Sequence, residues 1–371
     1  MDACPRSLCR GATPAATPRL ARILGGIAAG SVDALFRRGV LQHPPSPRDP
    51  DELAADIESF TAAHYEPRLL SEPQRFFIPP GAVDVHEVPR RRPVVRSLGG
   101  TIRCVDLRWR SEHGPFFFEA VRARYQAAER NTRGTARLFT HRDGPRPTAI
   151  LIHGYLGGMF GVEERMWPIR WLLRQGLDVA ISVLPFHGHR GSAGRFETPA
   201  WPNADMRVTA EGYRQAVWDL RVLSRALRER GAPAVGVVGM SLGGYTAALF
   251  ATVDDGVDFC VPMIPLASVA AFMDAHGTID GTPAQRARLR AAVEHQHAPI
   301  SPLSRPSRVS PARVRVVAGE YDRITPTRQA RLLAEHFACP LLTFPGGHLL
   351  QLGRKEPLGE VVTMLRAEGV L

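Results

Sequence analysis

The chain has 371 residues, of which 44% are hydrophobic and 22% are charged, with 34 glycines and 32 prolines. Apart from the excess of proline this is ordinary globular composition, which excludes a wholly disordered or fibrous chain. The net charge of +11 comes almost entirely from arginine, since Lys355 is the only lysine. The arginines are scattered as a coding bias would scatter them, without an aromatic RNA-binding motif, so we expect no nucleic-acid partner. Attraction to an anionic substrate or to a membrane surface explains the charge better than nucleic acid does.

The cysteines and the hydropathy of the sequence indicate the cellular compartment in which the protein is found. The five cysteines form no CxxC pair, which indicates neither a zinc site nor a disulfide framework and favours a cytoplasmic protein. No uncharged apolar run is long enough for a transmembrane helix. The stretch 23–35 is glycine-rich and contains Asp33, so we interpret it as a marginal helix or a disordered leader, with a peripheral membrane contact as the alternative.

The first part of the chain predicts few regular elements. Residues 1–50 are rich in Pro, Arg, Ala and Gly, and we expect a poorly ordered arm with one helix near 31–38. Helical spacing predicts a helix over 51–65, and Pro79-Pro80-Gly81 is a chain break. Further on, we expect strand pieces in 94–109 with a hairpin turn at Gly99-Gly100, an ambiguous segment at 116–128 and a strand at 135–140.

A regular alternation begins after Pro147. The predicted buried strands are 149–152, 177–184, 234–238, 259–264, 314–317 and 341–344. The predicted helices between and after them are 209–230, 242–252, 326–337 and 358–366. Continuous apolar strands that alternate with helices indicate an α/β fold, with a mostly parallel central sheet and helices on both faces.

The pentapeptide Gly239-Met240-Ser241-Leu242-Gly243 connects a predicted strand to a predicted helix. A sharp strand-to-helix turn needs small residues on both sides of its central serine, and it lifts the serine hydroxyl above the edge of the sheet. We therefore predict that Ser241 is a nucleophile, with Gly239 and Gly243 supporting its loop. The alternative is an ordinary glycine-rich turn.

A nucleophilic serine needs a base and an acid that orients the base. Asp322 follows the predicted strand 314–317, and His348 follows the last predicted strand on a Gly-Gly loop. Along the chain they come after Ser241, in the order serine, acid, histidine, which is one of the orders in which such triads occur. Glu320 is a rival for the acid. Asp254, Asp255 and Asp258 are weaker candidates, and the other histidines are expected to be structural or solvated.

An oxyanion hole needs backbone N–H groups near the reacting carbonyl. We predict that the amides of Leu242 and Tyr155 are the two donors. Gly154 lets the backbone come close to the serine, and His153 is expected to brace this loop rather than transfer protons. No GK[ST] sequence follows these glycines, which argues against a phosphate-binding loop.

Taken together in this order, His153-Gly154, the 239–243 pentapeptide, Asp322 and Gly347-His348 resemble the α/β-hydrolase superfamily from about Thr135 to the C-terminus. The resemblance implies an α/β-hydrolase domain over 94–371 with a small cap insertion at about 266–311. Residues 1–93 would be an N-terminal extension, partly disordered and partly helical. This extension, with its 76–80 run, resembles abhydrolase-domain family 18, for which lipid deacylation has been proposed. The superfamily's epoxide and dehalogenase branches use an aspartate nucleophile, so Ser241 argues against those reactions.

The predicted function is a serine esterase, or a lipase-like one, acting on a small-molecule or lipid ester through an acyl-enzyme intermediate. It requires no metal and no organic cofactor. Acyl transfer and peptide cleavage use the same triad, and a non-catalytic scaffold protein is the alternative from another class. We expect Met159, Phe160 and Phe186 to contribute an apolar pocket and the cap to contribute Phe272 and Met273. We predict that the arginines at 286, 288 and 290 of the cap form a solvated helix face. The alternative is that they bind a carboxylate or phosphate of the substrate. The oligomeric state is left open.

Overall fold

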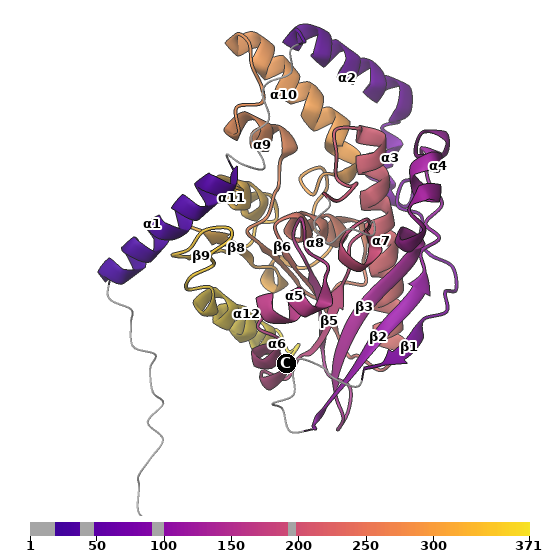
Figure 1. Ribbon diagram of the computed structural model, residues 1–371, viewed down its shortest axis with the longest axis vertical. Coiled ribbons are helices and arrows are strands. Elements are labelled where there is room, and N and C mark those ends of the chain that lie inside the picture. The colour runs from indigo at the N-terminus through magenta and orange to yellow at the C-terminus, as the bar shows by residue number, and fades with distance from the viewer. Residues whose placement is uncertain (1–18, 38–47, 91–99, 192–197) are drawn as a thin grey trace, which may run out of the picture.

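The computed structural model describes residues 19–37, 48–90, 100–191 and 198–371. Their centre is a nine-stranded sheet with the strand order β1-β2-β3-β5-β4-β6-β7-β8-β9 (Figure 1). The strands are β1 (His86–Pro89), β2 (Ile102–Arg110), β3 (Arg133–His141), β4 (Thr148–Ile152), β5 (Asp178–Ser182), β6 (Val235–Met240), β7 (Cys260–Met263), β8 (Val316–Gly319) and β9 (Leu341–Phe344).

Six neighbouring strands, from β5 through β4 and β6 to β9, run parallel, and β1, β2 and β3 pair antiparallel at the other side of the sheet. The expectation of a mostly parallel sheet is therefore confirmed. Parallel strands end at the same edge, so the loops that follow β4, β6, β8 and β9 gather there. This edge is where the sequence analysis placed its candidate residues.

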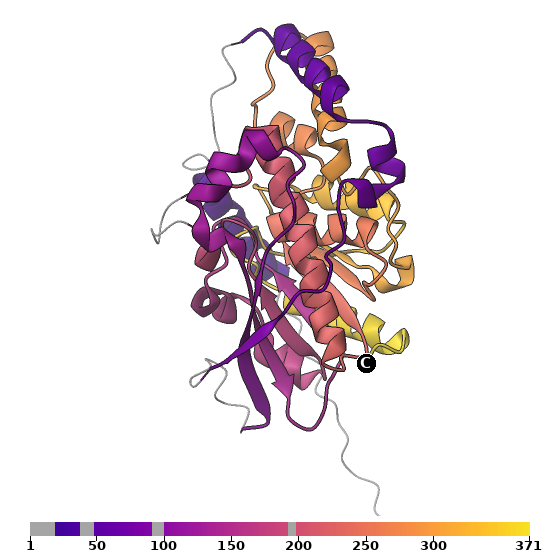
Figure 2. The ribbon, with the colours of Figure 1, turned by 90° about the vertical axis from the view of Figure 1, so that its right-hand side faces the viewer.

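Helices cover both faces of the sheet because alternate side chains of each strand point to opposite faces. On β4, Ile150 and Ile152 pack into one hydrophobic core, while Ala149 and Leu151 pack into the other. The first core is covered by α4 (Phe118–Ala127), α7 (Met206–Glu229), α8 (Leu242–Val253) and α11 (Thr327–His336). The second is covered by α5 (Phe160–Met166), α6 (Ile169–Arg174) and α12 (Lys355–Ala367). Figure 2 shows these layers from the side.

The N-terminal part contributes more structure than its composition predicts. A helix, α1 (Arg19–Phe36), begins well before the expected 31–38 segment and contains the buried Asp33. These residues form a helix, as the marginal-helix interpretation of 23–35 allowed, and are not part of a poorly ordered arm, while 1–18 and 38–47 lie outside the described part. Glycines lower local helix propensity, but at Gly26 a Cβ would overlap the ring of Tyr321, so the glycine allows a close tertiary contact that supports the helix.

The expected cap insertion forms α9 (Val269–Ala275) and α10 (Pro283–His297). They pack with α2 (Pro50–His64) around a small core of their own that includes Ala54, Leu289 and Val293. Figure 1 shows these three helices together at one end of the molecule. The segment expected to be ambiguous at 116–128 is the helix α4.

The antiparallel side of the sheet starts earlier than the proposed domain division. Strand β1 pairs with β2 along its whole length, so the division between residues 93 and 94 falls between two paired strands. The expected strand pieces of 94–109 correspond to β2, and the residues before Gly100 in the expected hairpin lie outside the described part. Among the described helices, none has the length and apolar character needed to cross a bilayer.

Candidate active site

Ser241 lies in the turn between β6 and α8 with φ 56° and ψ −114°, a left-handed conformation that a non-glycine residue rarely adopts. Its neighbours leave no room for side chains. A Cβ on Gly239 would overlap the carbonyl oxygen of Gly243, and a Cβ on Gly243 would overlap that of Ile152. These glycines therefore let the turn fold tightly against β4, and the turn places the serine at the first turn of α8.

Asp322 and His348 meet above the ends of β8 and β9. The His348 Nδ1 and Asp322 Oδ2 atoms are 2.8 Å apart, and both side chains are buried. The other carboxylate oxygen, Oδ1, accepts hydrogen bonds from the amides of Ile324 and Thr325, each at 2.8 Å. The rival acid Glu320 is exposed and accepts a hydrogen bond from the Thr343 hydroxyl instead. Asp322 is thus the acid that contacts this histidine.

Two neighbouring carboxylates act on the pKa of His348. Burial of the ring lowers the pKa of His348, but the charge and hydrogen bond of Asp322 and the charge of Asp33 outweigh burial, so the pKa lies above its ordinary value. With Nδ1–H donating to Asp322, Nε2 is left as the nitrogen that can accept a proton.

Ser241 and His348 line one cavity of about 290 Å³. Its apolar lining side chains are Tyr155, Leu156, Val162, Met166, Met240, Ile264, Ile324 and Leu349. No hydrogen bond joins the Ser241 hydroxyl to the His348 ring among the described contacts, so the two groups share the cavity without being bonded. A reacting molecule would find a hydroxyl and an imidazole at the same apolar site.

The loop after β4 lies directly against the serine. A Cβ on Gly154 would be 3.4 Å from Ser241 Cβ and 4.0 Å from its Oγ, which is ordinary contact distance. The amides of Tyr155 and Leu242 donate to no acceptor among the described residues. Tyr155 lines the cavity with Ser241, and Leu242 directly follows the serine at the start of α8. Two unpaired N–H groups at this place can bind an oxygen that carries negative charge.

His153 is fully buried beneath this loop. Its Nδ1 lies 2.8 Å from the carbonyl oxygen of Gly154, and its Nε2 accepts a hydrogen bond from the Leu184 amide at 3.0 Å. Burial lowers the pKa of His153. Both ring nitrogens are therefore occupied by backbone groups, and the neutral ring connects the β4 loop to the β5 loop.

Two residues that the sequence analysis did not single out as site residues contact His348. The Thr325 hydroxyl is 3.0 Å from His348 Nδ1 and 3.1 Å from Asp322 Oδ2. Asp33 on α1 accepts a hydrogen bond from the His348 amide at 2.5 Å and one from the Leu349 amide at 2.9 Å. The only sequence signal for Asp33 was its position as the single acid in the apolar stretch 23–35.

The loop residues that the sequence predicted for the pocket, Met159, Phe160 and Phe186, do not line this cavity. Phe160 packs under the guanidinium of Arg137, and Phe186 packs on Tyr125. The described residues that line the cavity include none from the cap. On α10, Arg288 forms ion pairs with Asp51 and Glu58 of α2, so this arginine holds two helices together rather than facing a ligand.

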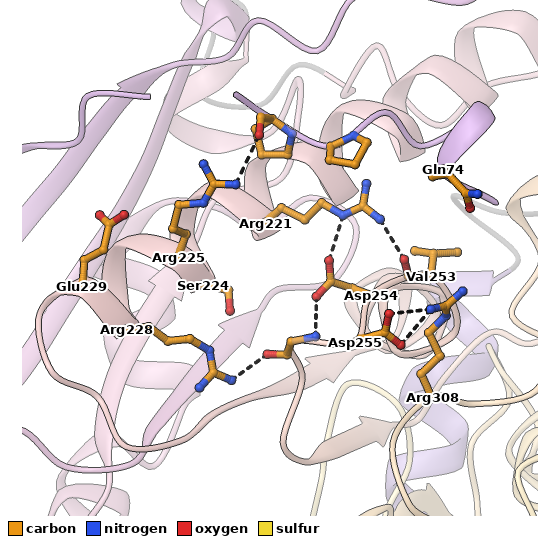
Figure 3. A pocket seen from close by; sticks show the side chains of 13 residues that line it. Gln74, Arg221, Ser224, Arg225, Arg228, Glu229, Val253, Asp254, Asp255 and Arg308 are labelled. Atoms are coloured by element: carbon orange, nitrogen blue, oxygen red, sulfur yellow. Dashed lines mark hydrogen bonds and ion pairs between the residues drawn. The ribbon is translucent and has the colours of Figure 1, made fainter. Parts of the chain in front are cut away.

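A larger cavity, of about 630 Å³, lies beside α7 and is lined by four arginines (Figure 3). The lining arginines are Arg221, Arg225, Arg228 and Arg308. Each is already bonded: Figure 3 shows contacts to carboxylates of the turn after α8 and to backbone carbonyls. Arg221 and Arg225 also donate hydrogen bonds to backbone carbonyls of residues 77–81, which attaches this segment to the sheet domain. The described lining of this cavity includes no histidine that could pair with a serine nucleophile. Within the described residues no group of three His, Cys, Asp or Glu side chains is arranged to hold a metal ion.

Comparison with known proteins identifies relatives that cover most of the chain. No protein-family model matches it. The "Uncharacterized protein Rv2627c" of Mycobacterium tuberculosis strain H37Rv is 31% identical over 323 residues, which cover 84% of this chain and 73% of the relative. The chain belongs to the family of Rv2627c. A second member, the "Uncharacterized protein MT2702" of strain CDC 1551, matches to the same extent.

Solved structures identify the fold of this Rv2627c-family member. Acetyl xylan esterase 1 from Thermoanaerobacterium sp. JW/SL YS485 aligns with a TM-score of 0.53 at 12% identity, covering 87% of this chain and 96% of the esterase. The acetyl xylan esterase from Paenibacillus sp. R4 aligns with a TM-score of 0.52 at 17% identity and the same coverage. The α/β-hydrolase fold expected from the motifs is thereby confirmed. The resemblance of the N-terminal part to abhydrolase-domain family 18 stays a prediction.

Proposed function

We propose that this protein is a serine hydrolase that cleaves a carboxylic ester through an acyl-enzyme intermediate. The observation that carries the proposal is that Ser241 and His348 line one apolar cavity, while Asp322 is hydrogen-bonded to the far side of the histidine ring. The strained φ of Ser241 also supports it, because such strain is typical of nucleophile turns. The structurally similar proteins named above are esterases, which agrees with this activity.

In the first half of the reaction, the Ser241 Oγ attacks the ester carbonyl and its proton passes to His348 Nε2. Asp322 accepts the hydrogen bond from Nδ1–H, which holds the ring in one tautomer and stabilises the imidazolium that forms. The amides of Tyr155 and Leu242 donate to the oxyanion of the tetrahedral intermediate, and each such donor contributes about 3 kcal/mol of transition-state stabilisation. His348 then protonates the departing alcohol, which leaves the acyl group on Ser241.

In the second half, water enters the cavity and gives a proton to His348 Nε2 as it attacks the acyl carbonyl. The second tetrahedral intermediate collapses, the acid leaves, and the proton returns to Ser241. Hydrogen bonds between nucleophile and base are often long before a substrate binds. We therefore expect the Ser241 hydroxyl and His348 to become bonded in the substrate complex.

The proposal is tested by labelling with a fluorophosphonate probe and by hydrolysis of p-nitrophenyl esters. We expect the protein to be labelled and active, and Ser241→Ala to lose labelling and at least about 10³-fold in kcat. Ser310→Ala is the matched control, because Ser310 is exposed and its side chain makes no cap hydrogen bond.

Labelling that persists in Ser241→Ala would contradict the assigned nucleophile. A folded protein that neither labels nor hydrolyses esters would favour the scaffold alternative. Transfer of the acyl group to an added alcohol, or cleavage of a peptide in preference to an ester, would redirect the proposal to the related reactions of the same triad.

A further inference from the structure

Helix α1 lies against the loop that carries His348. The Asp33 Oδ2 atom accepts a hydrogen bond from the His348 amide at 2.5 Å, and its Oδ1 accepts one from the Leu349 amide at 2.9 Å. Oδ2 also lies 3.3 Å from the amide nitrogen of Arg323, the residue after Asp322. The Asp33 side chain thus contacts both the loop that carries His348 and the loop that carries Asp322.

This contact is closely fitted. Asp33 is completely buried, and no described arginine or lysine forms an ion pair with it. A Cβ on Gly347 would be 2.5 Å from Asp33 Oδ2 and 3.1 Å from the backbone of Ala29, so the loop can approach α1 only with a glycine there. Burying an unpaired carboxylate costs free energy, which backbone N–H donors must offset. A carboxylate is also the small side chain that offers an acceptor oxygen to each of two successive amides.

We propose that Asp33 is a positioning residue for the proposed reaction: it holds the Gly347–Leu349 loop so that the His348 ring stays between Asp322 and Ser241. The inference rests on the proposed function, because it assigns to α1 a part in the same site. The N-terminal helix is then a component of the catalytic apparatus rather than an appended arm.

Asp33 also acts on His348 through its charge. Burial lowers the pKa of His348, whereas Asp322 and then Asp33 raise it. Other titratable or charged side chains near this region, on the elements packed around it, are Arg37 directly after α1, His276 after α9, Glu163 on α5 and Arg323 beside the acid. Removing the Asp33 carboxylate lowers the pKa of His348, because one of the two negative charges that favour the imidazolium is lost.

The test measures kcat, KM and the pH profile of Asp33→Asn and Asp33→Ala in the full-length protein with a p-nitrophenyl ester. Rates are expressed per active site counted by fluorophosphonate labelling, so unfolded molecules do not contribute. Asparagine keeps the size but presents one acceptor oxygen, and it removes the charge. We expect kcat to fall by about 10- to 100-fold, with the larger loss for alanine, and KM to change little, because misplacing a catalytic group mainly affects the chemical step.

The pH profile separates positioning of the base from simple docking of the helix. The neutral imidazole is the active base, so activity falls as the pH drops through the pKa of His348. We expect the acid limb of kcat/KM to move to lower pH in Asp33→Asn, since the pKa of the base falls. If kcat per active site and the acid limb both match the wild type, the proposal is wrong, even when the melting temperature falls.

A glycine variant tests the same contact from the other side. Gly347→Ala forces the loop away from Asp33, and we expect the same fall in kcat as in Asp33→Asn. Gly359→Ala on α12 is its control, because a Cβ there meets no atom within 4 Å. Ser31→Ala is the control on α1, since the Ser31 hydroxyl is exposed and bonds only within its own helix.

The labelling assay distinguishes failure of this inference from failure of the proposed function. If the wild type is not labelled at Ser241, the proposed function fails and with it the inference. If the wild type is labelled and active while both Asp33 variants and Gly347→Ala keep its kcat and pH profile, the inference alone is overturned.

Discussion

At the scale of single residues, the site contains two carboxylates that act on different parts of one histidine. Asp322 contacts the Nδ1 side of the ring, while Asp33 contacts the backbone amide of the same residue. Thr325 adds a hydroxyl that bonds Asp322 and the carbonyl oxygen of Ile264, which attaches the acid loop to the end of β7. The ring is thus constrained through its side chain and through its backbone, which is the arrangement that a precisely placed base requires.

The role of Asp322 predicts a large effect of a small substitution. Asp322→Asn keeps the shape but cannot stabilise the imidazolium or select its tautomer, so we expect kcat to fall by about 10³- to 10⁴-fold. Glu320→Gln is the matched control, because Glu320 is exposed and contacts Thr343. Steady-state kinetics on both variants decide which acid works with His348, and a larger loss in Glu320→Gln would exchange their roles.

The raised pKa of His348 predicts the position of the acid limb. Since the base must be neutral to accept the serine proton, kcat/KM falls as the pH drops through this pKa. We expect the midpoint of the fall in the wild type to lie above the ordinary imidazole value of about 6.5. A pH series of kcat/KM measures it, and a midpoint clearly below that value would contradict the electrostatic description of the site.

At the scale of elements, a buried polar network ties the antiparallel strands to the helix layer. Asp219 on α7 accepts hydrogen bonds from the Trp109 indole of β2 at 2.8 Å and from Arg190 at 2.6 Å. Arg190 also donates to the carbonyl oxygen of Asn131 at 2.8 Å. Arg190 follows β5 and Asn131 precedes β3. The ion pair between Asp219 and Arg190, with its hydrogen bonds, therefore connects α7, β2, the segment after β5 and the segment before β3.

Removing one partner of this network leaves a buried charge without compensation. We expect Asp219→Ala to lower the free energy of unfolding by about 3 to 5 kcal/mol, because the Arg190 guanidinium is almost fully buried. Urea unfolding followed by circular dichroism measures the change. Asp143→Ala, which breaks the exposed pair with Arg146, is the control and should leave the unfolding midpoint unchanged. Equal midpoints for both variants would show that the network contributes no stability.

At the scale of the whole molecule, exposed large apolar side chains are concentrated near the proposed active site. Among the residues that the structure describes, all but two of these side chains belong to α1, to the segment 156–166 or to the segment 349–352, and several of them also line the cavity. The two exceptions are Ile78 and Phe116. A surface of this kind next to a cavity is typical of a site that binds an apolar group.

This distribution predicts a preference for longer acyl chains. We expect kcat/KM for p-nitrophenyl hexanoate to exceed that for the acetate by about tenfold or more, because each buried methylene contributes about 0.8 kcal/mol. Val162→Asp in the cavity wall should reduce the hexanoate rate more than the acetate rate. Ile78→Asp is the control, since Ile78 is similarly exposed but lies outside the cavity lining. Equal rates for both esters in the wild type would contradict an acyl-binding role for these residues.

The sequence by itself determined the parallel part of the sheet and the order of the candidate residues. Buried parallel strands leave continuous apolar runs, so strands such as β4 and β9 were predicted to within a residue. The turn around Ser241 could be predicted because so sharp a turn leaves no room for side chains at the neighbouring glycines, and this requirement is local in the sequence. Asp322 and His348 were proposed because they lie in the loops that follow predicted strands, and parallel strands bring their ends to one edge.

Only the tertiary structure decided which distant side chains complete the site. The Asp33 contact joins residues 315 positions apart, and the helix that carries Asp33 contains glycines that weaken its local signal. The cavity lining was also mispredicted, since Phe160 and Phe186 turn into the core while Val162 and Met166 face the cavity. Local spacing encodes which residues share a strand or a helix face. It does not encode where a loop side chain points or which remote helix covers it, because those depend on packing between segments that meet only in the folded chain.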